Sequence, residues 1–137
     1  MPAIGRVLET SLYVDDLASS IGFYQRIFGL TALMADDRFC ALNVSSQQVV
    51  LLFVKHGTTE PIATPGGVIP AHDGEGTTHL AFTVATKDVA AWVEHLSVQG
   101  VAIESRVAWQ RGGFSLYFRD PDGHLLELVS PGCWEIY

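Results

Sequence analysis

Three residues that can bind a metal ion stand in segments whose other residues are apolar or small. Glu9 falls in an alternating apolar segment, His79 in Thr-His-Leu-Ala-Phe-Thr-Val, and Glu127 in Leu-Leu-Glu-Leu-Val. A carboxylate in such a strand must be paired, protonated or bound to a cation, because burying it alone costs several kcal/mol. The three side chains could therefore give two oxygens and one nitrogen to one divalent ion, leaving about three octahedral positions for substrate and water.

The same residues also have a purely structural interpretation. Glu9 could form an ion pair with Arg6 or Arg119, and His79 could be a hydrogen-bonded histidine of the core. From the residues alone, the metal site and these structural contacts remain open alternatives.

Polar side chains near the last predicted hairpin could line a substrate pocket. Ser115, Tyr117 and Arg119 alternate with three apolar residues, so one face of that strand is polar. Tyr117 could donate a proton or a hydrogen bond to a bound oxyanion, and Arg119 could hold a carboxylate or phosphonate. The turn with Trp109 and Arg111 could form the rim of the pocket.

His72 stands on the loop that leads into the His79 segment, from which it could reach a substrate as an acid or a base. Each of these candidates has a simpler alternative. Arg119 could be a surface charge at the end of a hairpin, the turn around Trp109 and Arg111 an ordinary loop, and His72 a solvated loop histidine.

Apolar periodicity predicts the same order of elements twice, about 70 residues apart. Each half begins with a strand, continues with a helix that ends at a glycine, Gly29 or Gly100, and closes with further strands. Asp15 or Asp16 could cap the first helix, and Thr86 or Asp88 the second. The predicted ranges are strand 7–14, helix 17–28 and strands 38–44 and 48–54, then strand 78–84, helix 89–96 and strands 101–108, 113–119 and 124–129.

This pattern predicts an α+β fold in which two βαβββ modules pair to form a concave mixed β-sheet with the helices on the outside. The 137 residues are expected to form one domain. Neither half could bury its sheet face alone, so the modules must pair within one chain or across two. The expected limits are about 5–55 for module 1, 56–77 for a linker rich in Gly, Pro and Thr, 78–131 for module 2, and 132–137 for a C-terminal tail.

The composition limits the partners and the compartment. Eight basic and fifteen acidic residues give a net charge of −7, which repels phosphate backbones, so no nucleic acid partner is expected. No run of about 18 apolar residues exists, so no membrane association is expected either. The N-terminal sequence lacks the build of a signal peptide, and Cys40 and Cys133 form no disulfide framework. These features predict a cytoplasmic protein with reduced thiols.

Two motifs resemble the vicinal oxygen chelate superfamily. Residues 12–24, LYVDDLASSIGFY, closed by Phe28-Gly29-Leu30, are similar to the opening of such a protein, and residues 118–128, FRDPDGHLLEL, to its closing hairpin. The superfamily holds glyoxalase I, extradiol dioxygenases, fosfomycin-resistance thiol transferases and metal-free bleomycin-binding proteins. The resemblance covers nearly the whole chain and implies the paired βαβββ fold, but it does not specify the reaction.

The ligand positions of the superfamily fall on Glu9, His79 and Glu127. Glu9 stands where the family usually has histidine, and the fourth ligand typical of glyoxalase I would fall near Leu52, which cannot bind a metal. The resemblance therefore argues against a glyoxalase I of the usual kind. Two carboxylates and one imidazole favour Mn²⁺, Fe²⁺ or Mg²⁺, while Zn²⁺ and Ni²⁺ also suit such ligands.

The leading prediction is a divalent-metal enzyme whose small substrate chelates the ion through adjacent oxygens, in a lyase, isomerase, transferase or dioxygenase reaction. Glu127 could double as a base. The alternative is a metal-free protein that binds an antibiotic or another planar molecule, as bleomycin resistance proteins do, with Trp109, Phe114 or Phe39 stacking on the ligand. The resemblance also implies a homodimer, in which the two halves of one site can belong to different chains.

Overall fold

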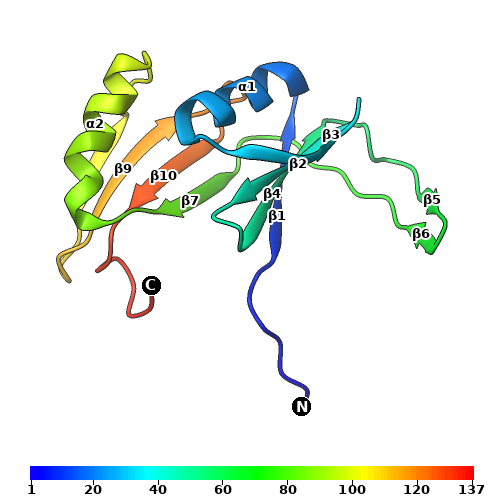
Figure 1. Ribbon diagram of the computed structural model, residues 1–137, viewed down its shortest axis with the longest axis horizontal. Coiled ribbons are helices and arrows are strands. Elements are labelled where there is room, and N and C mark those ends of the chain that lie inside the picture. Colours follow the sequence, from blue (N-terminus) through cyan, green and yellow to red (C-terminus); the bar gives the residue numbers. More distant parts are fainter. The chain divides into compact units, whose positions relative to one another are not determined.

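The computed structural model describes residues 1–137 and divides into two compact units, Met1–Gly76 and Thr77–Tyr137. The predicted α+β fold is confirmed, since each unit contains a four-stranded sheet and one long helix (Figure 1). The first unit contains β1 (Glu9–Val14), α1 (Leu17–Phe28), β2 (Thr31–Ala35), β3 (Phe39–Val44), β4 (Gln48–Val54), β5 (Ile62–Thr64) and β6 (Gly67–Ile69). The second contains β7 (His79–Thr83), a 3₁₀ turn η1 (Thr86–Asp88), α2 (Val89–Val98), β8 (Ser105–Ala108), β9 (Phe114–Arg119) and β10 (Leu125–Val129).

The two sheets have the same topology, which confirms the internal repeat. Their strand orders are β1-β4-β3-β2 and β7-β10-β9-β8, and in each the first and last strands of the module are parallel neighbours. Ser11 pairs with Leu51 in the first sheet, as Ala81 pairs with Glu127 in the second. Leu51 is therefore the counterpart of Glu127. The expected counterpart, Leu52, was wrong by one residue, and its side chain is fully buried in the core.

Helix α1 begins and ends where its sequence predicts. The Asp16 carboxylate accepts a hydrogen bond of 2.8 Å from the Ser19 amide, and Gly29 ends the helix with φ 68°. The helix packs against β3 and β4 and buries Phe23, Tyr24 and Ile27. Its apolar stripe thus covers one face of the first sheet and leaves the other face for chemistry.

The start of α2 differs from the prediction. Neither Thr86 nor Asp88 caps the helix with its side chain. The chain instead enters through η1, where the Asp88 amide donates to the Ala85 carbonyl, so backbone groups satisfy the first amides. Only Leu96 of this helix is fully buried.

The sequence pattern did not assign three short strands. All five residues of β2 are exposed, so this edge strand has no alternation of apolar and polar residues to detect. A β-bulge between Ala32 and Met34 also interrupts its register. The predicted linker contains the hairpin of β5 and β6, and β8 covers only the end of the predicted range 101–108.

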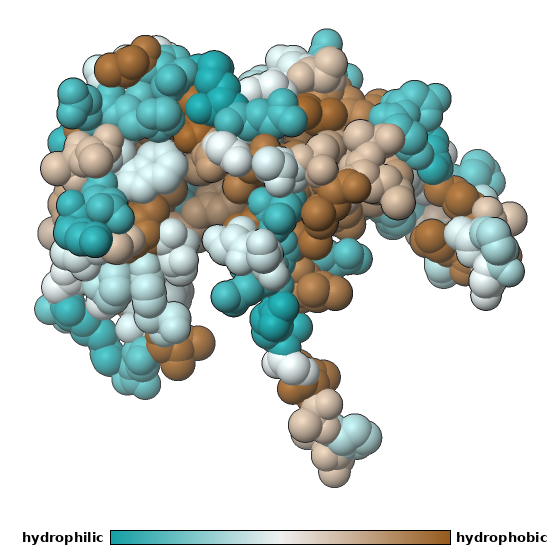
Figure 2. Space-filling model, in the orientation of Figure 1, coloured by the Kyte–Doolittle hydropathy of each residue, from teal (hydrophilic) through white to brown (hydrophobic).

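Apolar surface remains exposed on the first unit, including the N-terminal segment and the β5–β6 hairpin (Figure 2). Neither helix of the structure is long and apolar enough to cross a membrane. The large exposed apolar side chains of this unit are Met1, Ile4, Val7, Leu8, Leu33, Met34, Val68 and Ile69.

The cap of α1 gives a first prediction. Asp16→Ala should lower the free energy of unfolding by about 1 kcal/mol, because the Ser19 amide loses its acceptor. Asp16→Asn keeps a side-chain oxygen at the same place and should retain most of the stability. Denaturant unfolding of the two variants and the wild type measures the difference, and equal midpoints for all three would contradict the assigned cap.

Candidate functional site

One face of the second sheet carries the polar side chains singled out from the sequence. Glu127 pairs with Tyr117 on β9 and with Ala81 on β7, so these three side chains share a face, and His79 and Ser115 lie two residues along on the same side. We call this the Glu127 face. The flanking leucines of β10 point to the opposite, fully apolar side.

Glu127 is a buried carboxylate held by hydroxyl groups. Its residue surface is only 6% exposed, and the Ser115 hydroxyl donates to its Oε1 at 2.5 Å. Tyr117 also forms a hydrogen bond with Glu127. Burial, and then this hydrogen bond to a negative group, raise the pKa of Tyr117, so the phenol remains protonated at neutral pH.

His79 faces Glu127 across a short distance. Its Nε2 lies 3.2 Å from Glu127 Oε2, while its Nδ1 lies 3.0 Å from the Leu125 carbonyl oxygen. A carbonyl can only accept, so the Leu125 contact places a hydrogen on Nδ1. With a hydrogen on Nδ1, the Nε2 atom faces the carboxylate oxygen either through a second ring hydrogen or, as a lone pair, through a cation shared with Glu127.

Trp109 contacts Ser115, the residue that donates to Glu127. Its indole Nε1–H donates to Ser115 Oγ at 2.7 Å, so the side chain is engaged within the unit. Partial burial and the charge of Glu127 raise the pKa of the Cys133 thiol in the C-terminal tail. This tail, for which the sequence predicts no role, lines a hollow of about 710 Å³ together with Arg111.

Glu9 lies on β1 of the first unit, at the position equivalent to His79, and it is exposed. The two arginines proposed as its ion-pair partners bind elsewhere. Arg6 donates to the Gln47 carbonyl at 3.0 and 2.6 Å, and Arg119 to Glu104 at 2.7 and 3.0 Å. Glu9 thus forms neither structural ion pair, and the His79 side chain, 50% exposed, is not a core histidine.

The structure brings two of the three predicted ligands together, His79 and Glu127, both in the second unit. Glu9 belongs to the first unit. Within neither unit do three or more His, Cys, Asp or Glu side chains form a group arranged to hold a metal ion. The predicted three-ligand site therefore stays a prediction.

The two arginines predicted to bind substrate are both engaged in ion pairs. Arg119 contacts Glu104 and also donates to the Gly123 carbonyl at 3.1 Å, while Arg111 Nη2 lies 2.8 Å from Glu135 Oε1. The hydrogen bonds and the charge of Arg119 lower the pKa of Glu104. A substrate anion would have to compete with these carboxylates.

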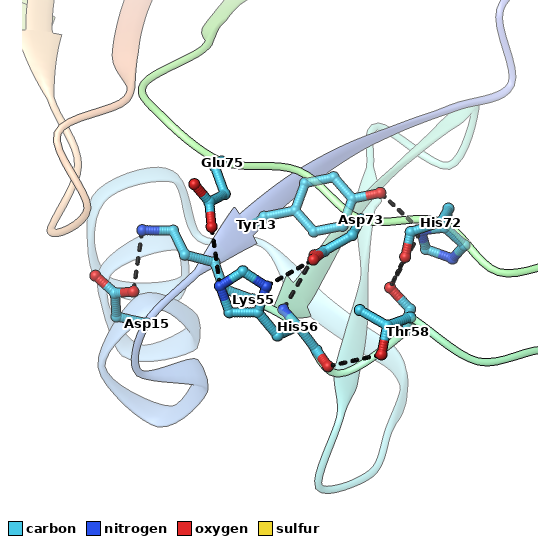
Figure 3. A network of polar contacts seen from close by, with 9 residues as sticks. Tyr13, Asp15, Lys55, His56, Thr58, His72, Asp73 and Glu75 are labelled. Carbon is cyan, nitrogen blue, oxygen red and sulfur yellow. Dashed lines mark hydrogen bonds and ion pairs between the residues drawn. The ribbon is translucent and has the colours of Figure 1, made fainter.

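His72 belongs to the first unit, within a polar network (Figure 3). Its Nδ1 lies 2.6 Å from the Tyr13 hydroxyl, the Thr58 hydroxyl donates to its carbonyl, and its ring stands edge-on to Phe53 with centroids 4.6 Å apart. His72 is therefore packed and hydrogen-bonded, not a solvated loop residue. Burial, and then the charge of Asp73, raise the pKa of Tyr13.

A second histidine fixes the same loop. His56 Nδ1 lies 2.7 Å from Asp73 Oδ2, and its Nε2 lies 3.1 Å from Glu75 Oε1 (Figure 3). The ring thus lies between two carboxylates, and the His56 amide also donates to Asp73 Oδ1 at 3.0 Å. The hydrogen bonds and the charge of His56 lower the pKa of Asp73.

The first sheet carries an aromatic row on the face opposite α1. Phe53 stacks on Phe39 with centroids 5.7 Å apart and on Tyr13 with centroids 5.9 Å apart. By register, Phe39 is the counterpart of Ser115 in the second unit. The two equivalent faces are thus chemically different, one aromatic and one with a carboxylate and an imidazole.

Comparison with known proteins identifies the family. The model of the Glyoxalase/Bleomycin resistance protein/Dioxygenase superfamily matches residues 4–128. The chain belongs to this superfamily. The expected resemblance and fold are both confirmed by this match.

Individual superfamily members are similar over most of their length. Metallothiol transferase FosB of Bacillus licheniformis is 28% identical over 116 residues, which cover 84% of this chain and 68% of the relative. Glutathione transferase FosA of Serratia marcescens is 31% identical over 121 residues, covering 86% and 75%. The crystal structure of lactoylglutathione lyase from Agrobacterium tumefaciens superposes with a TM-score of 0.89 at 26% identity and covers 98% of this chain and all of that one.

The Arg119–Glu104 ion pair gives a second prediction. In Arg119→Gln the pKa of Glu104 should rise toward its ordinary value, because its donor and its positive neighbour are lost. A depressed carboxyl pKa stabilises the fold above the unfolded pKa, and this contribution disappears as the pH falls through the folded pKa. The variant should therefore be less stable than the wild type at neutral pH, with the difference shrinking in acid.

Carboxyl carbon NMR titration measures the pKa of Glu104 in both proteins. Arg111→Gln, which breaks the ion pair with Glu135 instead, is the matched control and should leave Glu104 unchanged. An equal Glu104 pKa in the wild type and in Arg119→Gln would show that Arg119 is not held by this carboxylate in solution.

Proposed function

We propose that this superfamily member is a divalent-metal-dependent enzyme that acts on a small substrate chelating the ion through adjacent oxygens. His79, Glu127 and Glu9 are the proposed ligands. The observation that carries the proposal is the close approach of two side-chain atoms that can both bind a metal ion, His79 Nε2 and Glu127 Oε2, 3.2 Å apart. The similarity to the metallothiol transferase FosB also supports a metal.

The donor set fits a divalent cation. Imidazole nitrogen and carboxylate oxygen are ligands for Mn²⁺, Fe²⁺, Zn²⁺ and Ni²⁺, and both are oriented by outer contacts, His79 through the Leu125 carbonyl and Glu127 through Ser115. Glu9 presents an exposed carboxylate without either of its candidate ion pairs, on the strand equivalent to that of His79. A bound ion would polarise a substrate oxygen and stabilise negative charge that develops on it.

The remaining residues of the Glu127 face would act on the substrate itself. The protonated Tyr117 phenol, next to Glu127, is suited to donate a hydrogen bond to a substrate oxygen. Glu127 is a second candidate for proton transfer, because it is close to both Tyr117 and His79. Arg119 and Arg111 are not free to bind an anion unless their carboxylate partners release them.

The alternative function is a metal-free protein that binds a planar molecule. The aromatic row of Tyr13, Phe53 and Phe39 in the first unit is the observation that favours it, because offset ring stacks present apolar surface to a planar ligand. Elemental analysis of protein purified without chelator separates the two functions. About one transition metal ion per chain supports the enzyme, and metal-free protein that binds no added ion supports the alternative.

The third prediction concerns the ligands. His79→Ala and Glu127→Gln should each lower the affinity for Mn²⁺ because each removes a ligand. The loss should exceed the roughly 10- to 100-fold that is typical when an outer contact of a ligand is removed. Calorimetric titration with Mn²⁺, Fe²⁺, Zn²⁺ and Ni²⁺ measures the affinities. Glu94→Gln, which removes an exposed carboxylate of α2, is the charge-matched control and should bind as the wild type does.

Thermal melts give the sign of the Glu127 effect. With metal, Glu127→Gln should melt at a lower temperature than the wild type, since less binding energy stabilises the folded state. Without metal it should melt at the same temperature or higher, because a buried charge is removed. Equal melting temperatures in saturating metal would exclude Glu127 as a ligand.

The fourth prediction is a homodimer. Exposed apolar side chains on the N-terminal segment and on the edge strand β2 leave surface that a second chain could cover. Sedimentation at micromolar concentration should give twice the mass of the chain, and Leu33→Glu on β2 should shift the distribution toward the monomer. A wild type that sediments as a monomer would contradict the dimer.

A further inference from the structure

A chain of directed hydrogen bonds leads from Trp109 through Ser115 to Glu127. The indole Nε1–H can only donate, so Ser115 Oγ, 2.7 Å away, is the acceptor. The single hydroxyl hydrogen of Ser115 is then directed at Glu127 Oε1, 2.5 Å from its oxygen. The indole has no lone pair to offer and an ionised carboxylate has no hydrogen, so the two ends of the chain set its direction. The Tyr117 hydroxyl also forms hydrogen bonds with Ser115 and Glu127 and adds to the same cluster.

The surroundings leave this chain no room to rearrange. Ser115 has no exposed surface. The turn that carries Trp109 closes with hydrogen bonds from the Trp109 amide to the Gly113 carbonyl at 2.8 Å and from the Gly112 amide to the Trp109 carbonyl at 2.9 Å. A Cβ on Gly113 would lie 2.5 Å from the carbonyl carbon of Gly132, so the tail backbone crosses directly over the turn.

We propose that Trp109 and Ser115 are positioning residues that hold Oε1 of Glu127 and thereby turn Oε2 toward His79. This inference rests on the proposed metal-dependent function for its consequence, which is that Glu127 offers one oxygen to an ion while the other stays bonded to the protein. From the sequence, Trp109 is expected at the pocket rim and Ser115 in contact with substrate. The structure instead engages the donor of Trp109 and buries Ser115 completely.

This chain of hydrogen bonds from Trp109 through Ser115 to Glu127, which we call the relay, does more than support the structure, because each bond polarises the next. A hydroxyl that donates to a carboxylate becomes a better acceptor, so the charge of Glu127 strengthens the bond from Trp109. Removing the charge of Glu127 should therefore weaken the hydrogen bond of the Trp109 indole N–H, two hydrogen bonds away. Trp92 and Trp134 have no hydrogen bond to Ser115 and serve as internal references.

The first test uses the metal-free protein. In ¹⁵N-labelled protein, Trp→Phe variants assign the three indole N–H signals. Glu127→Gln should move the Trp109 indole proton upfield, because a neutral acceptor polarises Ser115 less, and should leave the Trp92 and Trp134 signals in place. A Trp109 signal that is unmoved by Glu127→Gln would overturn the relay, whatever the metal does.

The second test measures what the relay does for metal binding. Ser115→Ala should lower the affinity for Mn²⁺ about 10- to 100-fold, as expected for an outer partner of a ligand, and Trp109→Phe should lower it less because Ser115 can still donate. Ser130→Ala is the matched control. Ser130 is equally buried and accepts from the Phe114 amide at 2.9 Å, at the same end of the β9–β10 pair as Ser115, but has no hydrogen bond to Glu127.

The outcomes separate this inference from the proposed function. Equal Mn²⁺ affinities for Ser115→Ala and Ser130→Ala, with a wild type that binds, would overturn the positioning role and leave the metal-dependent function standing. A wild type that binds no Mn²⁺, Fe²⁺, Zn²⁺ or Ni²⁺ would overturn the proposed function, while the indole shift still decides whether Trp109 and Ser115 hold Glu127. Loss of affinity in Ser115→Ala alone, together with the upfield shift, supports both.

Discussion

The second unit is organised around the carboxylate of Glu127, which lies in an apolar strand and loses its hydration on burial. A buried carboxylate is tolerated only when hydrogen-bond donors or cations meet its lone pairs, and the side chains of the Glu127 face provide such partners. Ser115 and Tyr117 supply hydroxyl hydrogens, and His79 stands opposite the other oxygen. The polar side chains of β9 thus offset the cost of burying the Glu127 carboxylate, and His79 contacts its second oxygen.

The internal repeat separates the fold from the chemistry. Both units build the same four-stranded sheet with the same strand order, yet Leu51 and Ala41 in the first unit occupy the positions of Glu127 and Tyr117 in the second. The backbone hydrogen bonds that define the topology do not depend on these side chains. One copy of the sheet could therefore acquire an aromatic row beside Glu9, while the other acquired His79 and Glu127, without a change in the framework.

The sequence predicted the framework well because helices and strands follow apolar spacing. The ranges of α1 and β4 agree with the structure, and the remaining major elements differ by a few residues at their ends. It could not predict β2, whose exposed residues carry no periodic signal. Nor could it predict that α2 begins with a 3₁₀ turn, in which a backbone hydrogen bond takes the place of a side-chain cap.

The candidate site was predictable in its residue types but not in its contacts. The sequence shows Glu127 within an apolar strand, and it shows His79 at the strand position that Glu9 holds in the first half. The partners are not visible, because a hydrogen bond such as Trp109 to Ser115 depends on the turn between the strands and on which face of the hairpin the indole covers. Likewise, the ion pair of Arg119 with Glu104 joins residues whose proximity arises only from the register of β8 and β9.

The loop network of the first unit changes the mechanics of the connection between the two modules. The region after β4 has the composition of a long flexible linker, but Thr58 and His56 fasten it back through His72, Asp73 and Glu75. On the far side, the Thr78 amide donates to His124 Nδ1 at 3.0 Å, which anchors Thr78 to the second unit. Most of the predicted linker is therefore an ordered part of the first unit, and only Gly76 and Thr77 lie between these two sets of contacts. The entropy cost of ordering the loop is offset by contacts inside one unit.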